Sequence, residues 1–273
     1  MDEIERFIAE DMDAAGDITS KAVLRGERAI GLVISKGECI AAGLEEGAEV
    51  FGRMGVEAEL LVPDGREVSR GTEVLRTTGD GASILGAERL ALNIIMRMSG
   101  IATMTRRVVE ACRTVNPRIK VAATRKTTPG FRRYEKRAVA LGGGVPHRSG
   151  LYDMIIVKDN HLALCGGVET AIARLMEGRP AARVEIEVTK MEDALKAAGA
   201  EVDVIMLDNL ASEEGERIAN AVRAIAPRIE IEASGGITLE NAPLYARWAD
   251  IISLGALTHS YKAADFSLEV RRW

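Results

Sequence analysis

The chain has 273 residues, of which 47% are hydrophobic and 28% are charged, and its net charge is −5. This composition excludes a disordered chain, a collagen-like fibre and a coiled coil. The acidic balance disfavours nucleic acid and anionic membranes as partners, and no apolar run reaches the roughly 18–20 residues that a transmembrane helix needs. Three distant cysteines and three histidines argue against a disulfide framework and a His-rich metal site. The first residues are acidic, unlike a targeting peptide, so we expect a cytoplasmic protein.

The first part of the chain mixes short helices with strand-like segments. Residues 4–15 are predicted to form a helix and residues 17–20 a turn. From about 28 to 78, apolar stretches alternate with Gly-containing turns, which is typical of a compact β-rich unit. Residues 82–115 have apolar side chains at three- and four-residue steps, and Ser99-Gly100 is predicted to divide this segment into two helices.

After residue 118 the sequence alternates short apolar runs with stretches rich in Ala, Leu, Arg and Glu. A strand followed by a helix, repeated several times, is typical of βα units and a parallel sheet. Six strands with long crossovers favour an open, incomplete α/β barrel over a small doubly wound sheet. The predicted strands are 121–123, 154–157, 183–188, 203–207, 229–232 and 251–254.

Polar residues gather where the predicted strands end, and barrels of this kind have their active site there. Solvated loops would give part of this pattern. They would not place cations after the early strands, carboxylates at the middle strands and glycines after the last. The candidate residues are Thr124, Arg125, Lys126 and Lys158, then Glu187 and Asp208, then Ser234, Gly235, Gly236, Leu254, Gly255 and Ala256.

The segment from Arg118 to His161 has ten Lys or Arg residues against three acidic ones. For the four cations in residues 132–137, a solvated amphipathic helix is an equal alternative to ligand binding. His147 is either a structural histidine or a ligand-binding one, and its neighbour Arg148 is expected to disfavour the protonated ring. The remaining cations, Arg125, Lys126, Arg148 and Lys158, predict a polyanion site.

Glu187 and Asp208 on successive strands are poor partners for a salt-bridge network alone, because several charges would lose their hydration together. They suit Mg²⁺, which takes one or two carboxylates together with substrate phosphates. Glu185 shares the sheet face of Glu187 and would support it. The two glycine-containing loops after the last strands are typical of a phosphate site. Together these features indicate a phosphorylated sugar diphosphate that reacts with an acidic partner.

Seven segments of the chain resemble quinolinate phosphoribosyltransferase, and the resemblance covers nearly the whole chain. The most specific segment is TRKTTPGFRRYEKRAVALGGGVPHRSGLYDMIIVKDNH, residues 124–161. The others are GDIT, ERLALNIIMRMSGIAT, VEIEV, MLDN, EASGGI and SLGALTHS. The resemblance implies an N-terminal α/β sandwich domain, residues 1–103, and a C-terminal open α/β barrel, residues 104–273.

The resemblance also implies the reaction, in which phosphoribose passes from phosphoribosyl pyrophosphate (PRPP) to quinolinate with loss of CO₂. The products would be nicotinate mononucleotide and pyrophosphate, made for NAD biosynthesis. Such enzymes are dimers or higher homo-oligomers, and Arg89 would reach the neighbouring subunit's site. The resemblance implies quinolinate binding for Thr124, Arg125, Lys126, His147, Arg148 and Lys158. It implies 5′-phosphate binding for residues 234–236 and 254–256, and Mg²⁺ binding for Glu187 and Asp208. The implied catalytic residues are Lys126, Lys158, Glu187 and Asp208.

Pro146 departs from the family pattern, in which Asn is more frequent at this position. A proline removes one backbone donor and stiffens the turn, so the orientation of quinolinate could differ. A proline at this position resembles the pattern of paralogues of the same fold that are encoded at molybdenum loci. These paralogues tend to lack the KDNH run, which is intact here at residues 158–161. Two alternatives follow: a phosphoribosyltransferase for another aromatic acid, and a nucleotide sensor without catalysis.

Overall fold

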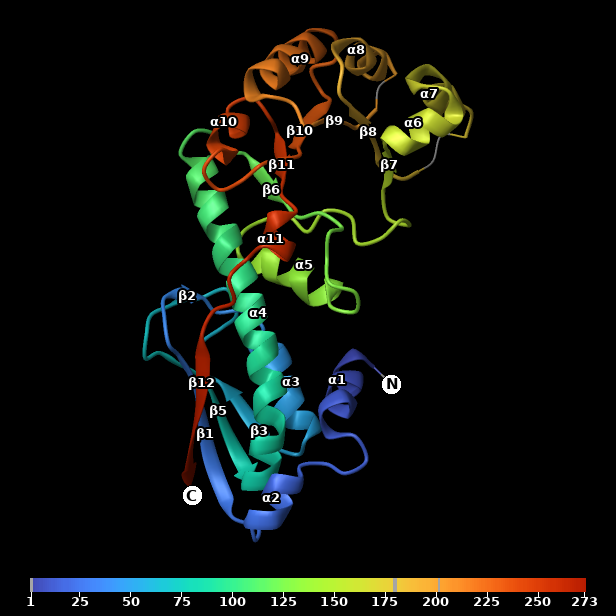
Figure 1. Ribbon diagram of the computed structural model, residues 1–273. Coiled ribbons are helices and arrows are strands. Elements are labelled where there is room, and N and C mark those ends of the chain that lie inside the picture. The colour runs from blue at the N-terminus through green and yellow to red at the C-terminus, as the bar shows by residue number, and fades with distance from the viewer. Residues whose placement is uncertain (1, 179–180, 201) are drawn as a thin grey trace. The chain divides into compact units, whose positions relative to one another are not determined.

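The computed structural model (Figure 1) describes residues 2–178, 181–200 and 202–273. The chain forms two compact units that interleave along the sequence. Unit 1 consists of the described residues of Met1–Arg106, Thr128–Gly142 and Ser260–Trp273. Unit 2 consists of those of Arg107–Thr127 and Gly143–His259.

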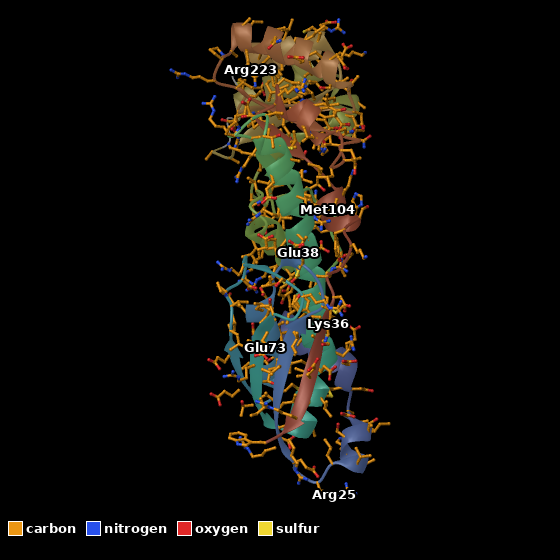
Figure 2. The ribbon with its side chains drawn as sticks, turned by 90° about the vertical axis from the view of Figure 1, so that its left-hand side faces the viewer. Arg25, Lys36, Glu38, Glu73, Met104 and Arg223 are labelled. Atoms are coloured by element: carbon orange, nitrogen blue, oxygen red, sulfur yellow. The ribbon has the colours of Figure 1, made fainter. Side chains whose placement is uncertain are left out.

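Unit 1 is built on a four-stranded antiparallel sheet in the order β12-β1-β5-β3. Its strand β1 alternates between buried and more exposed side chains, as expected for a sheet with one covered face. Helix α3 contacts β3 and β5, and α1 contacts α3. Lys36, labelled in Figure 2, follows β1, and its Nζ lies 3.2 Å from Oε1 of Glu269 on β12. The elements are α1 (Glu3–Met12), α2 (Ile18–Val23), α3 (Leu44–Arg53), α4 (Gly81–Arg113), α5 (Arg132–Leu141), β1 (Arg28–Ser35), β2 (Cys39–Ile40), β3 (Glu57–Leu60), β4 (Glu67–Val68), β5 (Glu73–Asp80) and β12 (Phe266–Arg272).

The prediction of a helix break at Ser99-Gly100 was wrong, because α4 is continuous from Gly81 to Arg113. Ser99 is fully buried, and its Oγ accepts a hydrogen bond from the N–H of Ala42 at 2.9 Å and donates one to the Ala42 carbonyl at 3.1 Å. A Cβ on Gly100 would lie 2.8 Å from the Cα of Ala263. The two small residues therefore permit close packing on the side of an intact helix.

The turn expected at residues 17–20 is also corrected. Asp17 is the N-cap of α2, and its side chain accepts hydrogen bonds from the N–H groups of Thr19 and Ser20. A short carboxylate before a helix satisfies amides that have no partner within the helix. The β-rich interpretation of residues 28–78 likewise missed α3, and strand β12 was not predicted.

Unit 2 has a six-stranded parallel sheet in the order β6-β11-β10-β9-β8-β7. The two outer strands, β6 and β7, do not pair with each other among the described residues. The prediction of an open α/β barrel is thus confirmed. The elements are β6 (Lys120–Ala122), β7 (Ile155–Val157), β8 (Val184–Val188), β9 (Val204–Asp208), β10 (Glu230–Ser234), β11 (Ile251–Ser253), α6 (Asp159–Cys165), α7 (Val168–Glu177), α8 (Met191–Gly199), α9 (Ser212–Ile225), α10 (Ala242–Ala246) and α11 (Ala256–His259).

The register of this sheet places the candidate residues on one face. Glu187 is level with Met206, Met206 with Glu232, and Glu232 with Ile251. Because side chains alternate between the two faces of a strand, residues two positions further along each strand share that face. On the same face, Val204 and Ile251 near the amino ends of their strands form a buried apolar cluster with Ala122, which is level with Ser253. The polar residues thus lie at the carboxyl end of an apolar interior.

Among the described residues, every helix is too short or too polar to cross a bilayer.

Candidate active site

A cavity of about 460 Å³ lies at the carboxyl ends of the strands of unit 2. It brings together most of the residues predicted from the sequence. The predicted residues that line it are Thr124, Arg125, Lys126, His147, Arg148, Lys158, Glu187, Asp208, Ser234, Gly235 and Gly236. The sequence interpretation gave no part in the cavity to six further lining residues, Ala123, Ile156, Met206, Asn209, Glu232 and Ser253.

Residues 254–256 do not line this cavity but lie against the segment that carries Lys126. A Cβ on Gly255 would lie 2.8 Å from Cδ of Lys126. Oγ1 of Thr258 donates a hydrogen bond to the Lys126 carbonyl at 2.7 Å. The glycine therefore gives room for the lysine side chain, and the loop after β11 supports the cationic segment.

The basic side chains occupy one part of the cavity wall. Arg125 and Lys126 are exposed, and neither has a carboxylate partner among the described residues. Burial lowers the pKa of the Arg148 guanidinium, and the nearby charge of Arg125 lowers it further. The charges of Glu185 and Asp153 act on Arg148 in the opposite direction. An anionic ligand would stabilise neighbouring cations of this kind.

Lys158 is paired with Glu187, and its Nζ donates to Oε2 of this nearly buried carboxylate. The backbone N–H of Lys158 donates to Nδ1 of His161 at 2.9 Å, so His161 supports the start of α6. Asp159, Asn160 and His161 are exposed and do not line the cavity. Of the KDNH run, only the lysine contributes to the wall.

Asp208 and the glycines after β10 line another part of the cavity. Nδ2 of Asn209 donates to Oδ2 of Asp208 at 2.5 Å, and the N–H of Asn209 donates to the Ser234 carbonyl at 2.9 Å. Gly235 has a φ of 85°, and a Cβ there would lie 2.8 Å from the nitrogen of Asn209. Only glycine fits this left-handed turn beside Asn209. The backbone of residues 234–236 is thereby left open to a ligand.

His147 lies deeper, between two fully buried carboxylates. Its Nε2 is 3.2 Å from Oε2 of Glu232 and 3.5 Å from Oε2 of Glu185. Burial alone would lower the pKa of His147, but the facing carboxylates of Glu185 and Glu232 raise it to about 9. The expectation that Arg148 would disfavour the protonated ring was therefore wrong, because two carboxylates from neighbouring strands outweigh one adjacent cation.

Glu185 and Glu232 could have been found from the alternation of each strand. Glu185 is two residues before Glu187, and Glu232 is two residues before Ser234, so each shares the face of a predicted site residue. The sequence interpretation gave Glu185 only a supporting role and gave none to Glu232. Among the described residues, His147, Glu185 and Glu232 are also the one group of three side chains whose ligand atoms lie within 4.8 Å of one another.

The cations of residues 132–137 lie in α5 of unit 1 and do not line the cavity. Arg137 forms ion pairs with Glu45, Glu46 and Asp64, and Lys136 is buried. Neither of the two interpretations that the sequence left open describes these two residues, since they are neither solvated nor part of the cavity.

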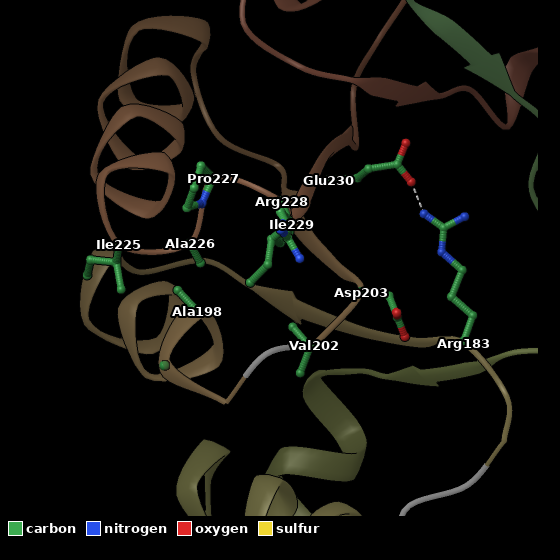
Figure 3. Close-up of a pocket in the computed structure, with 11 residues that line it drawn as sticks. Arg183, Ala198, Val202, Asp203, Ile225, Ala226, Pro227, Arg228, Ile229 and Glu230 are labelled. Atoms are coloured by element: carbon green, nitrogen blue, oxygen red, sulfur yellow. Dashed lines mark hydrogen bonds and ion pairs between the residues drawn. The ribbon is translucent and has the colours of Figure 1, made fainter.

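A second cavity in unit 2 lies at the opposite, amino-terminal ends of β8, β9 and β10 (Figure 3). Arg183 and Glu230 form an ion pair on one side of it, near Asp203. Ala198, Val202 and Ile225 provide an apolar side. None of the predicted site residues lines it, and parallel sheets bind their ligands at the carboxyl ends of the strands.

Arg89 lies in the part of α4 that belongs to unit 1, and its side chain is exposed. It does not line the cavity of unit 2. Its contribution to a neighbouring subunit stays a prediction.

The sequence matches two domain models of one family. Residues 17–99 match the N-terminal domain of quinolinate phosphoribosyl transferase, and residues 101–269 match the C-terminal domain. The chain belongs to the quinolinate phosphoribosyl transferase family. The resemblance found in the sequence is thereby confirmed.

Curated relatives and solved structures support this membership over nearly the full length. A Mycobacterium leprae protein named nicotinate-nucleotide pyrophosphorylase (carboxylating) is 36% identical, with 98% of this chain and 96% of the relative covered. A Methanothermobacter thermautotrophicus protein with the name "Probable nicotinate-nucleotide pyrophosphorylase [carboxylating]" is 39% identical, with 99% of each covered. The nicotinate-nucleotide pyrophosphorylase structure from Francisella tularensis is 33% identical with a TM-score of 0.91, covering 98% of this chain and 94% of that one. The predicted enzyme class agrees with these names.

Proposed function

We propose that this chain transfers the phosphoribosyl group of PRPP to the ring nitrogen of quinolinate, with loss of CO₂. The observation that carries the proposal is the cavity at the carboxyl ends of the strands of unit 2, where four basic side chains, the carboxylates of Glu187 and Asp208 and a glycine turn line one space. Quinolinate is a dianion, and PRPP carries a 5′-phosphate and a pyrophosphate. Both reactants carry several negative charges, which the basic side chains of this cavity would balance.

Quinolinate would bind at the basic wall. Arg125, Lys126, Arg148 and Lys158 all line it, and guanidinium groups match the geometry of carboxylates. Thr124, whose Oγ1 accepts a hydrogen bond from the N–H of Lys126 at 3.1 Å, would hold the segment in place.

PRPP would bind beside Asp208 and the glycines after β10. The backbone of residues 234–236 would hold the 5′-phosphate, with residues 254–256 as the second loop. Glu187 and Asp208 fit a hard cation that arrives with a substrate, because Mg²⁺ is usually held by one or two carboxylates together with phosphates and water. When bound, Mg²⁺ would neutralise charge on the departing pyrophosphate.

The chemistry needs no nucleophile from the protein. The quinolinate nitrogen attacks C1 of the ribose while the bond from C1 to pyrophosphate breaks with its electron pair on oxygen. Glu187 and Asp208 would offset the positive charge that develops on the ribose, and Lys126 and Lys158 would hold the attacking ring in place. The carboxylate beside the alkylated nitrogen then leaves as CO₂. The pyridinium ring accepts the electron pair, and a proton replaces the lost group.

The proposal includes four expectations from the sequence. These are a homodimer or higher homo-oligomer with Arg89 at the neighbouring site, a location in the cytoplasm, no nucleic acid or membrane partner, and domains divided between residues 103 and 104.

The deciding experiment is an assay with quinolinate, PRPP and Mg²⁺ that follows nicotinate mononucleotide by chromatography, with each component omitted in turn. We expect product only in the complete mixture. Nicotinate and other pyridine carboxylates serve as parallel substrates. Because Pro146 departs from the family pattern, product from one of these acids and none from quinolinate would favour a transferase for another aromatic acid. Binding without turnover of any acid would favour a nucleotide sensor.

A further inference from the structure

Glu232 is a buried carboxylate that the proposed reaction does not use. It has no exposed surface, although it lies on β10 in the same face as the cavity residues. A buried carboxylate is costly unless hydrogen bonds satisfy it. Its Oε1 accepts a hydrogen bond from Oγ of Ser253 at 2.6 Å, and its Oε2 faces Nε2 of His147 at 3.2 Å. Each oxygen therefore has a donor, and the carboxylate is fixed between β11 and His147.

Glu185 adds a second carboxylate to the same side of the imidazole. It too is fully buried, and neither of its oxygens has a hydrogen-bond partner among the described residues. Its closest approach to a donor is the 3.5 Å between its Oε2 and Nε2 of His147. Two buried acceptors thus converge on one ring nitrogen.

The other ring nitrogen of His147, Nδ1, contacts the backbone of the next residue, Arg148. The backbone N–H of Arg148 donates to Nδ1 of His147 at 2.9 Å. His147 itself has a φ of 57°, a left-handed conformation that is uncommon for a residue with a Cβ. Such a conformation persists only where its surroundings determine it. The imidazole is therefore a link between rigid strands and a strained turn.

We infer that Glu232 is a positioning residue for the proposed reaction: by fixing Nε2 of His147 it fixes the turn that places Arg148 at the substrate's carboxylates. Ser253 and Glu185 support it. The inference rests on the proposed function for the identity of the substrate, but the link from Ser253 through Glu232 and His147 to Arg148 is a property of this chain alone.

Three variants test this link. Glu232→Ala removes the acceptor, Glu232→Gln keeps an acceptor oxygen of the same shape, and Ser253→Ala releases the carboxylate while leaving it in place. Glu230→Gln is the matched control, since Glu230 precedes Glu232 by two residues on β10 but pairs with Lys120 and Arg183. Calorimetry measures the affinities for quinolinate and for PRPP with Mg²⁺ separately.

We expect Glu232→Ala to weaken quinolinate binding by about 10- to 100-fold, because a displacement of about 1 Å in a binding group has an effect of this size. PRPP binding should change by less than about threefold, Glu232→Gln should restore most of the loss, and Glu230→Gln should match the wild type. Wild-type quinolinate affinity in Glu232→Ala would overturn the inference, and so would an equal loss for PRPP. If Glu232→Ala does not fold, Ser253→Ala supplies the same comparison with a smaller expected loss.

A spectroscopic measurement separates this inference from the proposed function. The chain has three histidines, so long-range ¹H–¹⁵N spectra of the imidazoles can be assigned with a His147→Asn variant. Above pH 9, where the ring carries one proton, the His147 signals should place that proton on Nε2 in the wild type and in Glu232→Gln, with Nδ1 free to accept from the Arg148 N–H, and they should change in Glu232→Ala. If the wild type binds no quinolinate, the proposed function fails, while unchanged His147 signals in Glu232→Ala refute the link itself. A melting temperature that falls with EDTA in the wild type but not in His147→Asn would also refute it, since His147, Glu185 and Glu232 would then hold a metal ion.

Discussion

Nη2 of Arg97 lies 2.6 Å from Oε1 of Glu135, and this carboxylate has no exposed surface. The second oxygen of Glu135 accepts a hydrogen bond from the N–H of Thr128 at 3.1 Å. Thr128 follows directly on the segment that carries Arg125 and Lys126. The pair therefore fixes Thr128 within unit 1.

We predict that Glu135→Ala lowers the free energy of unfolding by about 3 kcal/mol, because it leaves a partly buried guanidinium and an amide without their acceptor. This loss of stability is at the low end of the range for breaking a buried ion pair, because a third of the Arg97 side chain is exposed. Chemical denaturation measures the change. The control is Glu59→Ala, which removes an exposed ion pair with Arg76 and should have little effect. Equal effects of the two substitutions would contradict the assignment.

Arg125→Ala and Lys158→Ala should each lower kcat/KM for quinolinate by more than about 100-fold while the protein stays folded, because a charge-assisted contact with the substrate is lost. Steady-state kinetics and circular dichroism check this prediction. Lys120→Ala is the comparison, since Lys120 lies on β6 at the opposite end from Arg125 and pairs with Glu230. Near-wild-type rates in either cavity variant would remove that residue from the proposed site.

Asp208→Ala should weaken the binding of PRPP with Mg²⁺ by about tenfold or more and leave quinolinate binding nearly unchanged. The reason is that Asp208 is assigned to Mg²⁺ and the ribose–pyrophosphate end of PRPP and not to the quinolinate carboxylates. Titration of each ligand by calorimetry separates the two effects, with Glu214→Ala on exposed α9 as the control. Parallel losses for both ligands would argue against a division of the cavity into two parts.

Gly235→Ala should raise KM for PRPP by about tenfold or more, because the positive φ and the nearby nitrogen of Asn209 leave no room for a Cβ. Gly199→Ala is a suitable control. Gly199 lies in α8, its φ is not positive, and nothing lies within 4 Å of an added Cβ. That control should be neutral or slightly stabilising. A Gly235→Ala variant with an unchanged KM would show that residues 234–236 do not hold the phosphate.

Burial raises the pKa of the Cys112 thiol to about 11, and burial also raises the pKa of Cys39. At pH 8 only about one Cys112 in a thousand is then a thiolate. A disulfide reagent should label the part-exposed Cys165 first and reach all three cysteines only in denaturant. The pKa of the Cys112 thiol is higher in the folded protein than in the unfolded chain. Its burial therefore lowers the free energy of unfolding only as the pH rises above about 8.5 towards 11, where the unfolded thiol ionises first. Rapid labelling of Cys112 at pH 8 would contradict its burial.

The strands of unit 2 could be read from the sequence with shifts of one or two residues at their ends. Each has a short run of apolar and β-branched residues, and polar or glycine residues lie at its end or just after it, so periodicity and strand-end chemistry gave the same prediction. The same reasoning located nine residues of the cavity wall, because the carboxyl ends of parallel strands meet at one edge. His147 and Arg148 were found through the cation-rich segment and the resemblance.

The remaining features depend on tertiary contacts that no local pattern contains. Ser99-Gly100 is typical of a helix end, yet both residues serve side-to-side packing of α4. The pKa of His147 depends on Glu185 and Glu232, which are distant in sequence, so its neighbour Arg148 gave the wrong direction. Most side chains of β12 are exposed, so its sequence lacks the apolar pattern of a buried strand. Only its pairing with β1 in the structure identifies it as a strand.

The pairing of β1 with β12 has a consequence for how the chain is made. The whole of unit 2 is translated between these two strands. Until residues 266–272 leave the ribosome, β1 has an open edge, and such edges favour association with other chains. Closing the sheet of unit 1 also joins segments at very large sequence separation, which slows folding. The later-made barrel can therefore fold while the earlier-made sheet is still incomplete.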